Sequence, residues 1–239
     1  MKTVVFVPTY DERENVVPLL EGLASLGIDG LEAIVVDDAS PDGTAECVRA
    51  WGRTHPFAGV IERAGPRGRG HAGREGYLAA LARGADRVIE MDGDLSHDPR
   101  DVPALLAAAE GADVVLGSRF VAGGSDADRA LWRRALTLAA NAFIRTVFGL
   151  GVRDCNSGFR CFRREALEAI DPASLESAGP AIVQEVLFRA HRRGLRIAEV
   201  PVAFCDRRQG ESKLGWWPLW QGYLTVLRLR VRELRGRTP

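Results

Sequence analysis

The 239-residue sequence lacks three features that would assign it to a specialised class of protein. Its 32 basic and 32 acidic side chains cancel, so we expect no general binding of nucleic acid. Its four cysteines (Cys47, Cys155, Cys161 and Cys205) form no CxxC pair, which indicates reduced thiols in a cytosolic protein. No stretch approaches the roughly 18 apolar residues of a membrane-spanning helix, and the first apolar run is too short for a signal peptide. We therefore expect a soluble or membrane-peripheral protein.

Charge is distributed unevenly, although the total is zero. Residues 200–239 carry eight Lys/Arg and three Asp/Glu, a net charge of +5, so residues 1–199 carry −5. A basic tail on an acidic body predicts an anionic surface as the partner of the tail. With 46% hydrophobic residues, the chain can bury a sizeable core as one α/β domain or a domain with an appendage.

Strand and helix patterns alternate over the first 120 residues. Buried strands are predicted where β-branched apolar runs end at polar or turn residues, and helices where apolar residues recur at helical spacing. The expected strands cover 3–10, 31–40, 59–64, 86–94 and 112–120, and the expected helices cover 14–27, 42–54, 73–85 and 99–110. This alternation predicts βαβ units, and therefore an α/β fold with a mostly parallel sheet and helices on both faces.

The second half of the chain follows a less regular pattern. The predicted elements are a helix at 128–149, a turn, short strand and helix at 154–170, a helix at 181–194 and a strand at 195–204. A polar loop at 205–217 precedes a helix at 218–234, in which an apolar stripe lies beside several arginines. We therefore divide the chain into a domain over 1–215 and a C-terminal amphipathic helix over 216–239.

Polar clusters follow four of the expected strands: PTYDE, DDASPDG, DGDLSHD and GSRF. Because ligands of open parallel sheets bind outside the carboxyl ends of the strands, these clusters are expected to converge at one edge. Each cluster alone is compatible with turn chemistry, DDASPDG above all. Their joint placement predicts a binding site.

The stretch VIEMDGDLSHDP (88–99) places Asp92 and Asp94 two residues apart after an apolar run. In extended backbone such residues point to the same side, so the two carboxylates are predicted to share one hard cation such as Mg²⁺. Substrate phosphates would supply further oxygen ligands. An acidic turn before the next helix is the alternative, and Asp98 is predicted to cap that helix. His97 is predicted to hydrogen-bond locally, with metal ligation as the alternative.

Cations for the other half of a phosphate site occur at several positions. The segment RAGPRGRGHAG combines Arg67 and Arg69 with glycines that allow backbone N–H groups to approach a ligand, and it is not a Walker A loop. The further candidates are Arg119, Arg133, Arg207 and Lys213. For each of them, a solvated surface charge is the alternative.

Six motifs resemble, in this order, family 2 glycosyltransferases of the GT-A (Rossmann-like) fold: PTYDERENV, VVDDASPDGT, EMDGDLSHDP, GSRFVAGG, CNSGFRCFRREAL and EVPVAFCDRRQGESKL. The resemblance covers residues 3–215. MDGDLSHDP and the final R…GESK are most similar to the polyprenyl (dolichyl) phosphate mannose synthases. That branch implies an inverting, metal-dependent transfer of mannose from GDP-mannose to a polyprenyl phosphate, with Mg²⁺ or Mn²⁺ as the cofactor.

The resemblance implies how a sugar nucleotide would be bound. The residues that would contact the base and ribose are Pro8, Tyr10, Glu12 and one of Asp37 and Asp38. Asp92 and Asp94 would bind the metal and the diphosphate, with Ser96 near a third ligand position.

The resemblance also implies an acceptor site. Arg119, Arg133 and Thr137 would contact the acceptor phosphate, while Arg207 and Lys213 would clamp nucleotide or lipid phosphate. An ionised phosphate monoester is itself the nucleophile and needs no strong general base. The enzyme chiefly aligns it and stabilises the leaving diphosphate, a catalytic role implied for Asp94, Arg119 and Arg133.

Several positions depart from the family pattern. Arg69 stands where Leu is usual, Gly93 where Ala is usual, and Thr137 where Ser is usual. Around 179–188 the family shows Phe-Gln-x-Glu, whereas AIVQEVLF keeps Glu185 but has Val183 at the Gln position. Because this region shapes the sugar pocket in the family, the identity of the transferred sugar is left open. Transfer of glucose from UDP-glucose, or transfer to a soluble small molecule, is the alternative.

The C-terminal tail combines aromatic and basic residues. It contains Trp216, Trp217, Trp220 and Tyr223, and arginines at 228, 230, 232, 235 and 237. This pattern is typical of an interfacial helix on an anionic leaflet, so we expect a peripheral protein at the inner face of the membrane. A packing helix with a solvated basic face is the alternative. A binding or regulatory protein without catalysis is disfavoured by the intact Asp92, Asp94, Arg119, Arg133 and Lys213.

Overall fold

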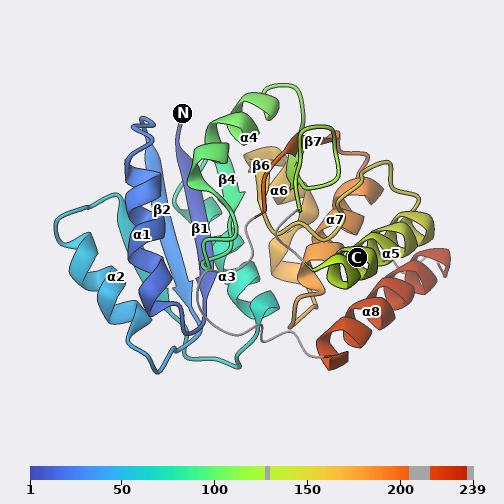
Figure 1. The fold of residues 1–239 in the computed structure, drawn as a ribbon, viewed down its shortest axis with the longest axis horizontal. Helices are drawn as coiled ribbons and strands as arrows, with labels where there is room; N and C mark the ends of the chain where they lie inside the picture. Colours follow the sequence, from blue (N-terminus) through green and yellow to red (C-terminus); the bar gives the residue numbers. More distant parts are fainter. Residues whose placement is uncertain (127–129, 205–215, 236–239) are drawn as a thin grey trace.

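The computed structural model describes residues 1–126, 130–204 and 216–235, with 216–222 and 233–234 described by their backbone alone. A seven-stranded sheet of order β3-β2-β1-β4-β6-β5-β7 forms its centre (Figure 1). The strands are β1 (Thr3–Thr9), β2 (Leu31–Asp37), β3 (Ala58–Glu62), β4 (Arg87–Glu90), β5 (Val114–Ser118), β6 (Arg160–Arg163) and β7 (Ile197–Pro201). The α-helices are α1 (Arg13–Ala24), α2 (Thr44–Gly52), α3 (Arg69–Ala82), α4 (Val102–Ala108), α5 (Leu131–Phe148), α6 (Arg164–Ile170), α7 (Ile182–Arg192) and α8 (Trp216–Leu234).

The sheet is mostly parallel. Strand β1 pairs in parallel with β2 and β4, β2 with β3, and β5 with β7. Strand β6 runs antiparallel between β4 and β5. The strands expected from the apolar runs are all present, so the prediction of an α/β fold is confirmed. The antiparallel insertion of β6 separates the ends of β4 and β5, where two of the polar clusters lie.

Helices cover both faces of the sheet and form two cores. Val4 and Phe6 face the core under α3, α5, α6 and α7, while Val5 and Val7 face the core under α1, α2 and α4. This alternation follows from the two-residue period of a strand, and burial on both faces explains why β1 reads as a continuous apolar run.

Helix α3 approaches β1 closely at Gly76. A Cβ atom built on Gly76 would lie 2.2 Å from the Phe6 ring, and the same ring meets Tyr77 edge-on at 4.8 Å between centroids. Only glycine fits here, and this close contact fixes the distance between α3 and the sheet.

Two element boundaries differ from the predictions. Strand β4 ends at Glu90, so Asp92 and Asp94 lie in a turn beyond the sheet and not on the extended strand predicted for them. Helix α3 begins at Arg69, before the predicted 73–85, even though glycines disfavour helix. The Gly70 N–H donates to the carbonyl of Ala178 at 2.8 Å, and such long-range contacts outweigh the local preference.

Helix α8 packs beside α5 and α7 (Figure 1). The rings of Phe143 and Tyr223 meet edge-on at 5.2 Å, and Val226 and Leu229 are buried in the core. The predicted C-terminal helix is therefore confirmed, whereas the division into two units stays a prediction. Among the described residues, no helix combines the length and the apolar character needed to cross a bilayer.

Candidate functional site

The loops after β4 and β5 bring the predicted metal ligand Asp92 near Arg119, one of the three predicted acceptor residues. Asp92 and Asp94 lie in the turn after β4, and Arg119 directly follows β5. Burial lowers the pKa of Arg119, but the carboxylates of Asp154, Asp126 and Asp92 raise it above its usual value. The structure thus places the predicted acceptor arginine within electrostatic range of the predicted metal ligand Asp92.

The turn after β4 is built by its own side chains. The carboxylate of Asp94 accepts a hydrogen bond from the Ser96 N–H at 3.1 Å, and Leu95 has a left-handed φ of 60°. Asp94 is buried, whereas the side chain of Asp92 is 35% exposed. The hydroxyl oxygen of Ser96 is buried and has no hydrogen-bond partner among the residues that the structure describes.

This set of donors suits a hard divalent cation. Two carboxylates and a buried hydroxyl offer oxygen ligands, which Mg²⁺ and Mn²⁺ prefer. In the described parts of the chain, no group of three or more His, Cys, Asp or Glu side chains could hold a metal alone. A cation at this turn would therefore need further oxygens from a bound diphosphate.

His97 supports the turn through local contacts. Its Nδ1 accepts a hydrogen bond from the Asp92 N–H at 3.1 Å, and its ring stacks on Phe159 at 5.0 Å. Burial lowers the pKa of His97, against the opposing effect of Asp92 and Asp94, which favours the neutral ring that this hydrogen bond requires. The local hydrogen bond predicted for His97 is confirmed. The cap predicted for Asp98 is also confirmed: at the start of the short 3-10 helix Pro99–Asp101 that precedes α4, its carboxylate accepts from the Arg100 N–H at 2.9 Å.

Arg119 is held by a partner that the sequence did not reveal. Its Nε and Nη2 donate to the two carboxylate oxygens of Asp154 at 2.7 and 2.8 Å, and the exposed fractions of the two side chains are 9% for Arg119 and 0% for Asp154. The guanidinium also lies 5.2 Å from the ring centroids of Phe120 and Phe204. Asp154 therefore fixes the plane and direction of the guanidinium.

The other predicted acceptor residues lie on α5. Arg133 stacks on the ring of Trp132 at 5.3 Å, and the Thr137 hydroxyl donates to the Arg133 carbonyl at 2.9 Å. Both are half-buried in the first half of the helix, and not in the loops that carry Asp92 and Arg119. Their contact with an acceptor phosphate stays a prediction. Arg207 and Lys213 lie outside the described residues.

The first predicted nucleotide loop follows β1. Pro8 is buried in the strand, opposite Val36. The Tyr10 hydroxyl accepts from Arg67 at 2.8 Å, and the Arg67 guanidinium lies 4.8 Å from the ring centroid. Glu12 accepts from the side-chain amide of Asn15 at 2.7 Å. An aromatic face beside a cation is suited to a nucleotide.

Asp37 and Asp38 both have structural partners. The fully buried carboxylate of Asp37 accepts from Thr9 at 3.0 Å, and from the N–H and hydroxyl of Ser40 at 2.9 and 2.6 Å. The carboxylate of Asp38 accepts from the Gly68 N–H at 2.5 Å and pairs with buried Arg63. Asp38 thus anchors the glycine-rich loop. The sequence alone did not predict this contact, because nothing near Asp38 or Gly68 in the chain indicates it.

Arg69 joins the glycine-rich loop to the turn after β4. Its Nη2 donates to Glu90 at 2.6 Å and to Asp92 at 3.2 Å. Glu90 is fully buried and also accepts from the Tyr77 hydroxyl. Arg69 is predicted to contact a substrate phosphate; it lies near the predicted metal ligands, but its observed partners are the carboxylates of Glu90 and Asp92.

Glu185 supports the segment beside the start of α3. Its buried carboxylate accepts from the N–H groups of Glu176 and Ser177, at 3.1 and 2.8 Å, and pairs with Arg189 at 2.8 Å. The neighbouring Gln184 donates to Asn156 at 2.6 Å. The role of Glu185 in a sugar pocket stays a prediction, and the observed contacts position backbone.

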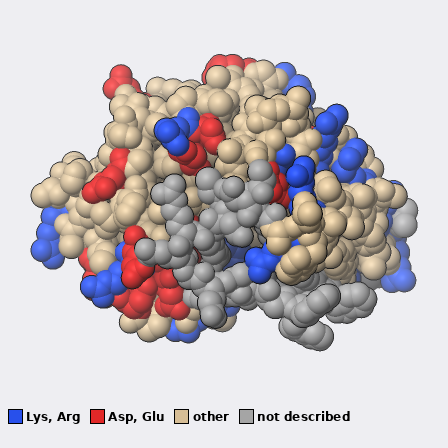
Figure 2. Space-filling model, viewed as in Figure 1, with Lys and Arg blue, Asp and Glu red and all other residues tan. Residues whose placement is uncertain are grey.

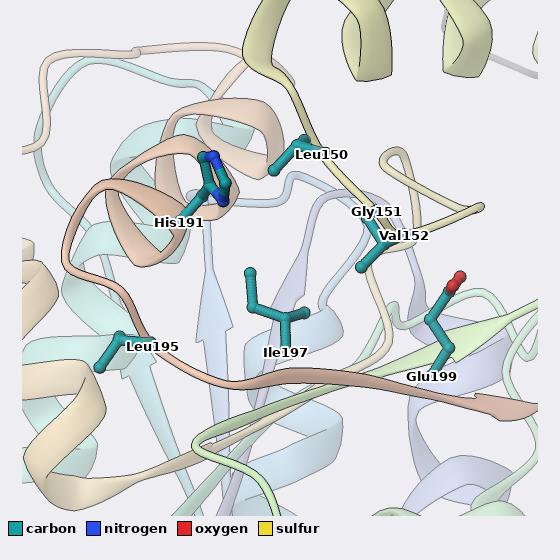
Figure 3. Close-up of a pocket in the computed structure, with 7 residues that line it drawn as sticks. All are labelled: Leu150, Gly151, Val152, His191, Leu195, Ile197 and Glu199. Atoms are coloured by element: carbon teal, nitrogen blue, oxygen red, sulfur yellow. The ribbon is translucent and has the colours of Figure 1, made fainter.

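A hollow of about 370 Å³ lies beside β7 (Figure 3). It is lined by Leu150, Gly151, Val152, His191, Leu195, Ile197 and Glu199. The carboxylate of Glu199 accepts from the N–H groups of Arg153 and Asp154 at 2.7 and 2.9 Å. The hollow therefore borders Glu199, which supports the Arg119–Asp154 pair, and its lining contains none of the predicted site residues.

Curated relatives match nearly the whole chain. It is 36% identical to an undecaprenyl-phosphate mannosyltransferase of Micrococcus luteus, over 99% of both chains. It is 37% identical to a polyprenol monophosphomannose synthase of Mycolicibacterium smegmatis, over 98% of this chain and 91% of the relative. A dolichol-phosphate mannosyltransferase of Pyrococcus furiosus is 34% identical over 98% of this chain and 65% of the relative.

Solved structures share the fold. Glucosyl-3-phosphoglycerate synthase from Mycobacterium tuberculosis, in complex with UDP, superimposes with a TM-score of 0.70 and 21% identity, over 100% of this chain and 81% of that chain. The same enzyme with Mn²⁺, UDP-glucose and phosphoglyceric acid gives a TM-score of 0.68. The predicted GT-A fold is thereby confirmed.

The family model for glycosyl transferase family 2 matches residues 4–171, which include β1 to β6 and the loops that carry Asp92, Asp94 and Arg119. The chain therefore belongs to glycosyl transferase family 2 and is a glycosyltransferase.

Proposed function

We propose that the protein transfers mannose from GDP-mannose to a polyprenyl phosphate, with inversion at the anomeric carbon and with a divalent metal ion. The observation that carries this proposal is the placement of the oxygen-donor turn, Asp92 to Ser96, beside Arg119. The turn can hold a metal ion with its diphosphate, and Arg119 can hold an anionic acceptor. The names of the curated relatives support the sugar and the acceptor class.

Asp92, Asp94 and Ser96 would hold Mg²⁺ or Mn²⁺ together with the diphosphate oxygens. Bound there, the ion would neutralise the negative charge that develops on the leaving GDP. Tyr10 follows β1, which lies next to β4 in the sheet, and Arg67 of the loop between β3 and α3 contacts it. Together they would bind the nucleoside part of the donor.

The acceptor phosphate is itself the nucleophile. One of its ionised oxygens forms the bond to the anomeric carbon while the bond from that carbon to the diphosphate oxygen breaks, and GDP leaves. No proton needs to be removed from the nucleophile. Arg119, held by Asp154, orients the acceptor phosphate. The rate acceleration comes from this alignment and from preorganised charge.

We infer that the protein meets its lipid acceptor as a peripheral protein at the inner face of the membrane. Helix α8 supports this proposal, because Leu227 and Val231 are exposed on it one turn apart, beside Arg228.

The experiment is transfer of radiolabelled mannose from GDP-mannose to polyprenyl phosphate with Mg²⁺ or Mn²⁺, measured as label extracted into organic solvent. We expect label in the organic phase, and none with EDTA. Label from other sugar nucleotides but not from GDP-mannose would refute the choice of mannose. Thermal shifts with GDP, UDP, CDP and TDP, each with metal, identify the nucleotide independently of any acceptor.

A second candidate keeps the fold and changes the substrates, with another sugar such as glucose from UDP-glucose or with a soluble acceptor. Val183 favours it, because this apolar residue stands where the family pattern has Gln, and it is buried in the core. Transfer to a soluble acceptor without any transfer to polyprenyl phosphate would establish this second candidate.

A further inference from the structure

Arg69 places a positive charge against the predicted metal ligand Asp92. One nitrogen of its guanidinium, Nη2, donates to Glu90 at 2.6 Å and to Asp92 at 3.2 Å. The Glu90 carboxylate is fully buried, whereas the side chains of Arg69 and Asp92 are 22% and 35% exposed. A ligand from solvent can therefore reach the contact between Arg69 and Asp92, but not the Glu90 carboxylate.

Glu90 holds Arg69 in this place. A buried carboxylate is costly unless it is hydrogen-bonded and paired with a cation. Glu90 accepts from the Tyr77 hydroxyl and pairs with Arg69. Gly73 leaves the room that the guanidinium occupies, since a Cβ atom there would lie 3.1 Å from Arg69 Nη1. The buried acid on β4 and the glycine on α3 thus both accommodate the same cation.

The family's metal chemistry does not explain this cation. The family pattern has Leu at position 69, and leucine carries no charge that could neutralise Glu90 or meet Asp92. The Nη1 atom of Arg69 is buried and has no hydrogen-bond partner among the residues that the structure describes. The two carboxylates therefore do not use the full donor capacity of the guanidinium.

Charge decides how Arg69 affects a metal ion at the turn after β4. Without metal, the guanidinium neutralises Asp92. A divalent ion that takes up the same carboxylate meets the positive charge of Arg69 at close range, so repulsion opposes binding of the metal alone. A diphosphate supplies anionic oxygens both for the ion and for the guanidinium, and planar guanidinium groups bind phosphate oxygens well.

We propose that Arg69 exchanges Asp92 for a diphosphate oxygen when the sugar nucleotide binds, and thereby makes binding of the metal ion depend on the nucleotide. The proposal rests on the proposed function insofar as that function places a metal ion and a diphosphate at this turn. Arg69 keeps its bond to the buried Glu90 and changes only its solvent-accessible partner. Metal and nucleotide then bind together, and the metal alone binds weakly.

The exchange predicts a reciprocal coupling between the two ligands. If the nucleotide tightens binding of the metal, the metal must tighten binding of the nucleotide by the same factor. We expect this factor to be about 100-fold for Mn²⁺ and GDP in the wild type. A side chain that only stabilises the fold would change the melting temperature and leave the coupling factor unaltered.

The test begins with Mn²⁺ binding to the nucleotide-free protein, followed by the electron paramagnetic resonance signal of free Mn²⁺. We expect Arg69→Leu to bind Mn²⁺ at least roughly tenfold more tightly than the wild type, because a nearby positive charge is removed. Titration calorimetry of GDP with Mn²⁺ and with EDTA then gives the coupling factor. We expect Mn²⁺ to enhance GDP binding about tenfold less in Arg69→Leu than in the wild type.

Two further variants make these results specific. Arg74→Leu is the matched control, because it removes the same charge from the same helix at an exposed position, and it should leave both measurements nearly unchanged. Arg69→Leu leaves Glu90 buried without its cation. Arg69→Leu with Glu90→Gln therefore provides a second variant with the same expectation, in which no unpaired charge is buried.

Surface carboxylates also bind Mn²⁺, and their contribution must be separated. Figure 2 shows a large acidic cluster on the side of the molecule that α1 and α2 occupy in Figure 1. Asp92→Asn leaves that cluster unchanged. The loss of Mn²⁺ binding in this variant therefore measures the turn after β4 alone.

Unchanged or weaker Mn²⁺ binding in folded Arg69→Leu protein, with or without Glu90→Gln, would overturn the exchange alone. Mn²⁺ binding that Asp92→Asn fails to reduce would overturn the metal site of the proposed function and the exchange with it. If UDP but not GDP couples to Mn²⁺, the choice of GDP-mannose is refuted, and a coupling to UDP that Arg69→Leu weakens still supports the exchange. None of these readouts needs turnover.

Discussion

Arg119 and the fully buried Asp154 form a bidentate pair at the centre of the candidate site, with Nε and Nη2 at 2.7 and 2.8 Å from the two carboxylate oxygens. Glu199 fixes the Asp154 backbone in turn, by accepting its N–H at 2.9 Å. A cation held in this way costs little reorganisation when an anionic acceptor arrives, which is what preorganised charge requires.

Asp154→Asn should therefore affect the acceptor more than the donor. The amide keeps one acceptor oxygen for Arg119 but loses the second and the charge. We expect kcat/KM for the acceptor to fall about 10- to 100-fold, with nearly unchanged GDP affinity, and the free energy of unfolding to fall by about 1–3 kcal/mol. Steady-state kinetics with varied acceptor and GDP titration calorimetry measure the two effects.

The matched control for this prediction is Asp113→Asn. Asp113 likewise accepts two hydrogen bonds from one guanidinium, that of Arg196, at 3.1 and 3.0 Å, besides one from the Arg196 N–H at 2.8 Å, but the arginine side chain is 62% exposed. An exposed pair contributes little, so activity and stability should stay near those of the wild type. Equal losses in both variants would mean that burial of the Arg119–Asp154 pair has no special effect.

Asp94→Asn should abolish the metal-dependent part of nucleotide binding. A ligand that binds the folded state at 100 times its dissociation constant stabilises the protein by about 2.7 kcal/mol. We expect the rise in melting temperature that Mn²⁺ adds to GDP to disappear in this variant. Asp98→Asn is the control, because Asp98 caps the short 3-10 helix Pro99–Asp101 before α4, and it should retain the Mn²⁺ effect. A full Mn²⁺ effect in Asp94→Asn would remove Asp94 from the metal site.

The strands and their burial could be predicted from the sequence, because β1, β2 and β4 are buried on both faces and their sequences are therefore apolar runs. The end of β4 could not. The Met91 N–H still donates to Phe6, at 3.2 Å, but the next residues bend away to bond with His97 and Ser96. Apolar periodicity carries no information on such polar contacts.

The candidate residues could be predicted by type, but their partners could not. Arg160 illustrates the difficulty: it lies in β6, is fully buried and donates to the carbonyls of Ser157, Val183 and Cys155. The pairs Arg63–Asp38 and Arg119–Asp154 likewise join residues far apart in the chain. Each pair depends on tertiary placement, and nothing local distinguishes its arginine from a surface charge.

Gly76→Ala should destabilise the protein by overpacking. The added methyl group would lie 2.2 Å from the Phe6 ring, so α3 must move away from the sheet. We expect the free energy of unfolding to fall by about 1–3 kcal/mol in denaturant titrations. Gly179→Ala is the control, because a Cβ atom there meets nothing within 4 Å, and its change should stay within about 0.5 kcal/mol. Equal stability of the two variants would show that α3 shifts without cost.

Two core cysteines should resist alkylation in the folded protein. Burial raises the pKa of both Cys155 and Cys161 to about 12, from an ordinary value of 9.0, so almost no thiolate exists near neutral pH. Iodoacetamide with peptide mass mapping should leave both unlabelled until guanidinium unfolds the chain, whereas half-buried Cys47 should react earlier. Because the unfolded chain loses these protons at lower pH than the folded chain, stability should decline as pH rises from about 9 towards 12. Rapid labelling of Cys155 or Cys161 in the native protein would contradict the burial of these thiols.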